Sequence, residues 1–194
     1  MREYIRSQME ETRGIIETML GNQELLARVE AAASATISSI RLGGKVMLAG
    51  NGGSAADAQH IAGEFVSRFA FDRPGLPAIA LTTDTSILTA IGNDYGYESL
   101  FARQVQAHAK AGDVLIAYST SGQSPNIIAA LEEARRADVV CVGMTGNRGG
   151  PMQPLCHHYL DVPSADTPKI QEGHAVIGHI LCGLVEKAIF ERRA

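Results

Sequence analysis

The sequence of 194 residues has no tryptophan, only three cysteines, and no uninterrupted run of 18 apolar residues. The missing tryptophan excludes nothing. Cys141, Cys156 and Cys182 form no C-x-x-C pair, so this odd, scattered set predicts buried free thiols in a reducing cytoplasm rather than disulfides or a zinc knuckle. The apolar runs are too short to predict a membrane span, and the charged N-terminal segment lacks the apolar centre of a signal peptide.

An excess of positive charge is also missing. The formal net charge is −4, with 17 Lys and Arg against 21 Asp and Glu. This balance predicts neither a nucleic acid nor an anionic membrane as a partner. A hydrophobic content of 45% and a charged content of 20% are ordinary for a soluble globular protein. At this length we expect a single domain over residues 1–194, with a helical extension at 1–42 and an α/β part at 43–194.

Residues 1–42 show helical periodicity and no strand pattern. Gly21-Asn22 separates two predicted helices, and Gly43-Gly44 ends the second. The apolar residues of the two faces are Ile5, Met9, Ile16 and Leu20, then Leu25, Leu26, Val29, Ala33, Ile37 and Ile40. Such wide apolar faces must pack either on the protein's own core or on another subunit, and the pattern leaves both possibilities open.

After Gly44 the pattern changes to short apolar runs that alternate with helical segments. The runs predict strands at 45–49, 78–81, 114–118, 139–144 and 158–162, and helices are expected at 54–70, 97–110, 125–136 and 169–191. Alternation of this kind is typical of a parallel sheet with helices on both faces, which is a three-layer α/β sandwich. Ligands bind such sheets outside the carboxyl ends of the strands.

Two predicted strands end in unusual loops. The first strand runs into a glycine turn, Asn51-Gly52-Gly53-Ser54. The third runs into a hydroxyl loop, residues 119–124, with the hydroxyl groups of Ser119, Thr120, Ser121 and Ser124. Ser124 is a candidate helix N-cap followed by a first-turn proline, so backbone N–H groups would face the loop. Capping alone would need only one of the four hydroxyls, so we favour a phosphate site. No lysine follows the glycines and the G-x-G-x-x-G spacing is missing, which points to a sugar phosphate rather than a nucleotide.

The helix after the glycine turn carries His60 and Glu64 four residues apart, on one face. Alone this spacing is more often a surface ion pair than a metal site. Gln171, His174 and His179 on the last helix are candidates to complete a zinc site, although glutamine is an unusual zinc ligand. Arg68 continues the His60–Glu64 face and could pair with Glu64 or meet oxygens of the ligand. The remaining histidines, His108, His157 and His158, are expected to be solvated or satisfied by hydrogen bonds.

Taken together, several segments resemble the bacterial phosphoheptose isomerases of the sugar isomerase (SIS) fold. The segments are GNGGSAADAQHIAGEF, AIGNDYG, STSGQSPN, TGNRGG and IQEGHAVIGHI, and the resemblance covers essentially the whole chain. It implies a flavodoxin-like parallel sheet, a cytoplasmic homotetramer with active sites at subunit interfaces, and one Zn²⁺ per subunit. The implied reaction converts D-sedoheptulose 7-phosphate to D-glycero-D-manno-heptose 7-phosphate, the first step towards ADP-heptose for lipopolysaccharide core or capsule.

The resemblance also assigns residues. The positions that match the family's zinc ligands are His60, Glu64, Gln171 and His179, and Glu64 and His179 match its proton-transfer pair. The positions that match its substrate contacts are Asn51, Gly52, Gly53, Asn93, Asp94, Ser119, Thr120, Ser121 and Ser124. We expect further substrate contacts at Ser54, Glu64, Arg68 and Gln171. The segment 164–169 departs from some members, so the resemblance assigns no role to Asp166.

The chemistry is consistent with these assignments, because ketose–aldose isomerisation needs a base, an acid and stabilisation of an enediolate. Two other readings remain: a non-catalytic SIS protein that binds a sugar phosphate or a replication initiator, and an isomerase of another phosphosugar. The non-catalytic proteins need not keep all four metal-site groups, which favours the enzyme. Gln171 and His179 lie eight residues apart, about 12 Å along a straight helix. Either the helix begins irregularly, or one ligand comes from a neighbouring chain.

Overall fold

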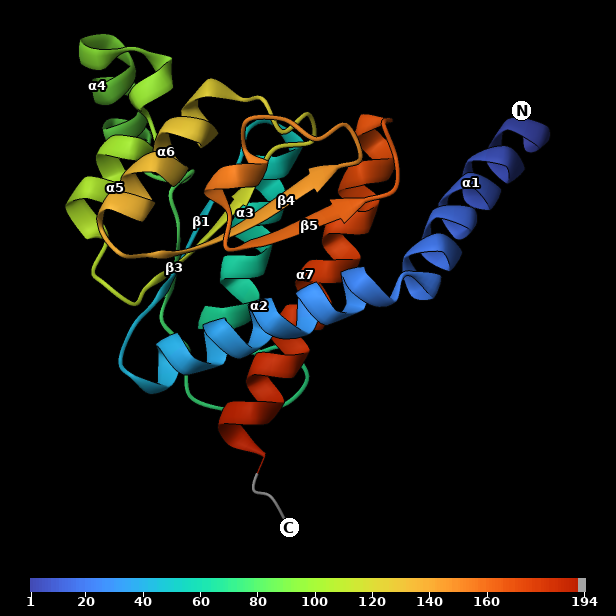
Figure 1. Ribbon diagram of the computed structural model, residues 1–194, viewed down its shortest axis with the longest axis horizontal. Helices are drawn as coiled ribbons and strands as arrows, with labels where there is room; N and C mark the ends of the chain where they lie inside the picture. The colour runs from blue at the N-terminus through green and yellow to red at the C-terminus, as the bar shows by residue number, and fades with distance from the viewer. Residues whose placement is uncertain (192–194) are drawn as a thin grey trace.

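Five apolar segments form one parallel sheet in the computed structural model, which describes residues 1–191. The strand order is β2-β1-β3-β4-β5. From β1 the chain first adds β2 on one side and then β3, β4 and β5 on the other, so the switch point of the sheet lies between β1 and β3. Helices cover both faces of the sheet (Figure 1), which explains why the strands read as apolar throughout. This confirms the predicted three-layer architecture. The strands are β1 (Val46–Ala49), β2 (Ala78–Ala80), β3 (Val114–Tyr118), β4 (Val140–Gly146) and β5 (His158–Val162).

Successive strand residues point into two separate cores. Leu48 and Ile116 lie in the core beneath α2 (Gln23–Arg41), α3 (Gly53–Val66) and α7 (Thr167–Phe190). Met47 and Leu115 lie in the opposite core, beneath α4 (Thr85–Tyr95), α5 (Ala102–His108) and α6 (Pro125–Arg136). Two short 3₁₀ helices, η1 (Tyr97–Ser99) and η2 (Gln153–Leu155), complete this part of the chain. Cys141 and Cys182 are buried free thiols as predicted, and Cys156 is a half-buried one.

Three helix predictions need correction. The single helix expected at 97–110 is instead the 3₁₀ helix η1 followed by the separate helix α5. The sequence pattern missed α4, an 11-residue helix in which no residue is buried and whose apolar face is therefore weak. Asp84 caps the N-terminus of α4, since its side chain accepts a hydrogen bond from the Ile87 N–H. The helix after the glycine turn was expected to reach residue 70, but it ends at Val66. The segment that follows is held by contacts with α7, described below.

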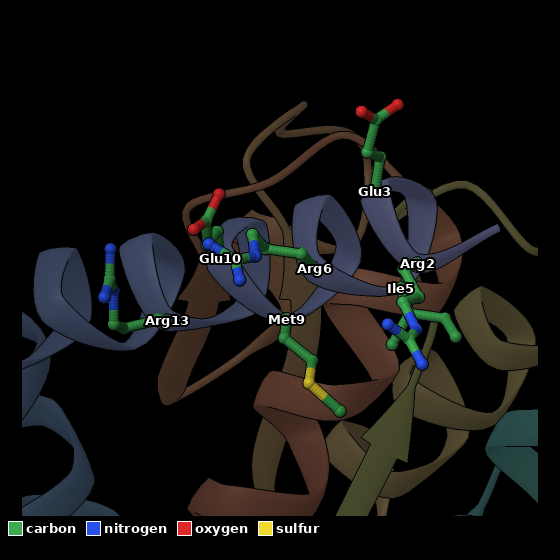
Figure 2. Close-up of a pocket in the computed structure, with 7 residues that line it drawn as sticks. All are labelled: Arg2, Glu3, Ile5, Arg6, Met9, Glu10 and Arg13. Carbon is green, nitrogen blue, oxygen red and sulfur yellow. The ribbon is translucent and has the colours of Figure 1, made fainter.

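The first helix, α1 (Arg2–Gly21), projects away from the sandwich (Figure 1). Met19 is its only buried residue, and the exposed fractions of Tyr4 and Met9 are 69% and 70%. Figure 2 shows the side chains of Ile5 and Met9 on one side of this helix. The C-terminal part of α1 packs on the protein's own core through Ile15, Ile16 and Met19, whereas Ile5 and Met9 in its N-terminal part are exposed. An exposed helical segment of this kind is marginally stable in water.

The last helix, α7, packs closely against both the sheet and α3. A Cβ atom placed on Gly173 would lie 2.7 Å from the Val162 side chain, and one on Gly178 would lie 2.7 Å from that of Ile61. Its length and apolar composition would also allow α7 to span a membrane, but α7 packs on α2, α3 and the sheet, as core helices do. Gly178 lets α7 approach α3 and Gly173 lets it approach β5, so side chains from α3 and α7 meet at the surface.

His174 on α7 is fully buried, and its Nε2 lies 3.1 Å from the backbone oxygen of Thr145. Burial lowers the pKa of His174 to about 4, against an opposing effect of the bond to Thr145. The unfolded chain, with a histidine pKa near 6.5, therefore binds more protons than the folded protein between these values. Stability should fall as the pH drops through this window.

We expect the free energy of unfolding to fall by about 2 kcal/mol between pH 7 and pH 5 because of His174 alone. The measurement is urea unfolding at both pH values for the wild type and for His174→Gln, which does not titrate but keeps a donor for Thr145. The variant should lack this part of the pH dependence. Equal losses in the two proteins would show that His174 does not carry it.

Candidate active site

The glycine turn after β1 is joined to the start of α6 by a pair of asparagines. Asn51 and Asn126 exchange two amide hydrogen bonds of 2.9 and 2.8 Å, and the hydroxyl group of Tyr97 donates to Asn51 Oδ1 at 2.9 Å. Gly52 has a φ of +57°, a conformation that favours glycine. The turn and the hydroxyl loop thus lie side by side at the carboxyl ends of β1 and β3, the position where sheets of this topology bind ligands.

The hydroxyl loop has the polar groups of an anion site. Ser119 Oγ and Ser124 Oγ lie 2.9 Å apart, and the Gln123 N–H donates to Ser121 Oγ at 3.2 Å. Ser124 occupies the N-cap position of α6 as predicted, but its side chain makes no capping hydrogen bond. The hydroxyl instead faces Ser119, and Ser121 and Thr120 are half-buried beside it. Ser119 Oγ also accepts a hydrogen bond from the Ser124 N–H at 3.4 Å, so part of the hydroxyl set holds the loop in place at the α6 N-terminus.

His60, Glu64 and His179 come together on the outer surface of α3 and α7. One ligand atom from each lies within 4.8 Å of the others, and the two Nε2 atoms of the histidines are 2.8 Å apart. Glu64 Oε1 lies 3.7 Å from His60 Nε2. The side chain of His60 is 51% exposed and that of Glu64 is 25% exposed, so the cluster is reachable from outside.

This cluster fits a zinc ion. Two imidazole nitrogens and a carboxylate are typical zinc ligands, and ligand atoms in a tetrahedral site lie about 3.3 Å apart given Zn–N bonds of 2.0–2.1 Å. A shift of the rings by about 0.5 Å would therefore admit the ion.

Gln171 lies apart from the cluster. Its amide is beside the start of α3, where a Cβ atom on Gly53 would lie 2.5 Å from Gln171 Nε2. The helix α7 begins at Thr167 and is regular through Gln171. An irregular start of this helix, which could have brought Gln171 close to His179, is therefore excluded. His60 and His179 meet within one chain, with 2.8 Å between their Nε2 atoms. Gln171 is the predicted ligand that the cluster of one chain does not include.

The other predicted contacts are placed around the carboxyl edge of the sheet. Ser54 is buried in the first turn of α3, and Asn93 donates a hydrogen bond of 2.8 Å to Asp94 on the exposed surface of α4. A cavity of about 310 Å³ beside Asn51 and Gly52 extends to α4 and is lined also by Thr82, Thr89 and Tyr97. Sequence reasoning missed this cavity because it depends on α4.

Arg68 does not extend the His60–Glu64 face as predicted. It is exposed and lies beyond the end of α3. Among residues 1–191, the ion pair formed by Glu64 joins it to His60, not to Arg68. His157 is satisfied as expected, since its Nδ1 accepts a hydrogen bond from the Cys141 N–H at 2.9 Å.

The fold is a parallel α/β sandwich with a loop of serine and threonine hydroxyl groups at its switch point and a His–Glu–His cluster on the surface of α3 and α7. The model of the SIS domain family matches residues 9–146. The curated phosphoheptose isomerase of Burkholderia pseudomallei strain 1710b is 68% identical over 190 residues, which are 98% of this chain and 96% of that protein. That of Aneurinibacillus thermoaerophilus is 58% identical over 193 residues, 100% and 98% of the two chains.

The solved structures agree. The phosphoheptose isomerase of Neisseria gonorrhoeae superposes with a TM-score of 0.89 at 38% identity, over 96% of this chain and 98% of that one. The chain therefore belongs to the SIS domain family and, within it, to the phosphoheptose isomerases, which are enzymes. The non-catalytic reading considered from the sequence is set aside, because these relatives match at high identity over nearly the full chain.

Proposed function

We propose that the protein converts D-sedoheptulose 7-phosphate to D-glycero-D-manno-heptose 7-phosphate in the cytoplasm, as the first step of ADP-heptose biosynthesis for lipopolysaccharide core or capsule. The observation that carries the proposal is the cluster of His60, Glu64 and His179, which supplies the base, the acid and the metal ligands that a ketose–aldose isomerase needs. The hydroxyl loop would hold the phosphate, with Asn51, Asn93 and Asp94 along the path of the sugar.

In the proposed mechanism Glu64 removes a proton from C1 of the ketose while His179 donates one to the oxygen on C2. The enediol so formed has its double bond between C1 and C2. Glu64 then returns a proton to C2, and His179 takes the proton from the oxygen on C1, which leaves the aldose. Zinc, held by His60, Glu64, His179 and Gln171, would polarise the substrate oxygens and stabilise negative charge on them.

We further propose that the active site is completed between chains of a homotetramer. Gly53 contacts Gln171 near the start of α3, and His60 is seven residues further along, about 10 Å by helical rise. Gln171 and His179 are separated by about 12 Å in the same way. Both values separate backbone positions, and the Gln171 amide itself lies against Gly53, at the end of α3 far from Glu64. A Gln171 side chain from a neighbouring chain, together with its hydroxyl loop, would meet the cluster.

Apolar surface supports this assembly. An apolar cavity of about 380 Å³ lies between α1, α2 and α7, lined by residues that include Leu20, Leu26, Val176 and Ile180. Ile180 is 44% exposed although it neighbours His179. Surface of this kind next to functional groups is typical of a subunit interface.

Sedoheptulose 7-phosphate offered to zinc-loaded protein, with the product aldose followed by NMR, tests the proposed substrate. We expect turnover of the heptulose, and slower turnover of a pentulose 5-phosphate offered at the same concentration. Faster turnover of the shorter sugar would assign the enzyme to another phosphosugar, and no turnover of either would remove the proposal.

The phosphate site has its own test. Ser121→Ala should raise KM roughly 10- to 100-fold, because a hydrogen bond to a charged group is worth about 1.5–3 kcal/mol. The control is Ser38→Ala, which removes an exposed hydroxyl on α2. The measurement is KM for the heptulose phosphate in both variants. An unchanged KM in Ser121→Ala, with only the stability altered, would mean that the loop serves the fold alone.

A further inference from the structure

The segment between α3 and β2 crosses the end of α7 and is held there by a buried ion pair. Arg73 Nε donates to Glu186 Oε1 at 2.9 Å, and the side chains of Arg73 and Glu186 are only 3% and 1% exposed. Charged groups are seldom buried this completely unless every polar atom is satisfied. A buried pair also adds little net stability compared with apolar side chains of similar volume. Both side chains of the pair also bind backbone groups of neighbouring segments.

Glu186 fixes the backbone of the segment on α7. Its two carboxylate oxygens accept hydrogen bonds from the N–H groups of Phe69 at 2.9 Å and Ala70 at 2.7 Å. Burial opposes the charged form, but these bonds and Arg73 outweigh it and hold the pKa of Glu186 below its usual range. Phe69 is thereby placed against the cluster, since its ring centroid lies 5.6 Å from that of His179.

Arg73 binds the C-terminal end of α3. Its guanidinium donates to the backbone oxygen of Glu64 at 2.8 Å and to that of Phe65 at 2.6 Å, in the last turn of α3. These carbonyl groups have no partner within the helix, and a cation at a helix C-terminus is favourable. One ion pair therefore holds the helix that carries His60 and Glu64 and the helix that carries His179.

We propose that Arg73 and Glu186 are positioning residues for the active site, which set the distance and orientation of Glu64 relative to His179. The inference rests on the proposed function, because it concerns the geometry of the same metal and proton-transfer groups. Neither residue is placed in contact with the substrate. Their loss should therefore affect metal affinity and kcat, while KM, which depends on the hydroxyl loop on other elements, stays near the wild-type value.

The test compares Glu186→Gln with Asp113→Asn. Asp113 is a matched control, since its carboxylate is 2% exposed and accepts from the Lys45 ammonium and from the N–H groups of Lys45 and Lys110, at the amino ends of β1 and β3. Zinc affinity is measured by chelator competition, and kcat and KM are measured separately, at a temperature where both variants are folded. We expect Glu186→Gln to weaken zinc binding 10- to 100-fold, the range for residues that orient metal ligands, and to lower kcat. Asp113→Asn should lose stability only.

Arg73→Lys keeps the charge but not the forked donors, so it tests the hold on α3 even if Glu186→Gln does not fold. We expect it to lower zinc affinity and kcat in the same direction. Wild-type zinc affinity and kcat in folded Arg73→Lys or Glu186→Gln would overturn the inference, as would equal losses in Asp113→Asn. A wild-type protein that binds no zinc would instead count against the proposed function, so the two failures are distinguishable.

Discussion

Glu64→Gln is expected to fold and to bind the sugar phosphate, but to turn it over at least ~10²-fold more slowly, the low end for the loss of general-base catalysis. The amide oxygen can still ligate a metal, as Gln171 is proposed to do. It cannot accept the proton from C1. Exchange of the C1 proton of the substrate with D₂O should therefore disappear together with turnover, because both require the same abstraction.

NMR on zinc-loaded Glu64→Gln protein separates the two roles of Glu64. The sample must first be shown to hold as much zinc as the wild type. Exchange at a rate near that of the wild type would mean that Glu64 is only a metal ligand. The base would then have to be another group, and His179, 2.8 Å from His60 between their Nε2 atoms, would be the first candidate.

Mixing two inactive proteins should restore activity if the site is shared between chains. Gln171→Ala removes the glutamine of one chain, and His60→Ala removes part of the cluster of another. After subunit exchange, one in four random pairings combines an intact Gln171 with an intact cluster, so roughly a quarter of the wild-type activity should return.

The matched control mixes His60→Ala with His179→Ala. These two side chains meet within a single chain, so neither protein can supply the other with a complete cluster, and no activity should return. Exchange is verified by native mass spectrometry of differently tagged subunits. Absence of complementation between Gln171→Ala and His60→Ala, despite proven exchange, would place the whole site within one chain.

The sequence predicts the sheet well because its strands are buried on both faces. Runs such as Val114–Tyr118 are apolar at every position, and both ends of this strand agree with the prediction. Because these strands alternate with helices along the chain, a parallel sheet with helices on both faces is the architecture that the sequence predicts. The helix α4 escaped because it packs only by partly buried residues such as Leu88 and Ile91, which leaves the periodic signal weak.

The site is predictable where it is local. The spacing of His60 and Glu64 places both on one face of α3, and the hydroxyl loop is visible as a cluster of serines. That His179 joins them depends on the close approach of α3 and α7, which residue spacing alone does not specify. Arg73 and Glu186 lie 113 residues apart, and an isolated Arg and an isolated Glu carry no pattern that predicts their pairing.

Removal and return of zinc tests most directly the central claim that His60, Glu64 and His179 form a metal centre for isomerisation. The protein is dialysed against a chelator, its fold is checked by circular dichroism, and turnover of sedoheptulose 7-phosphate is followed by NMR before and after titration with zinc. We expect loss of turnover in the metal-free protein, and recovery that saturates at about one zinc per subunit in the wild type but not in His60→Ala. Full turnover by folded, metal-free protein would contradict it.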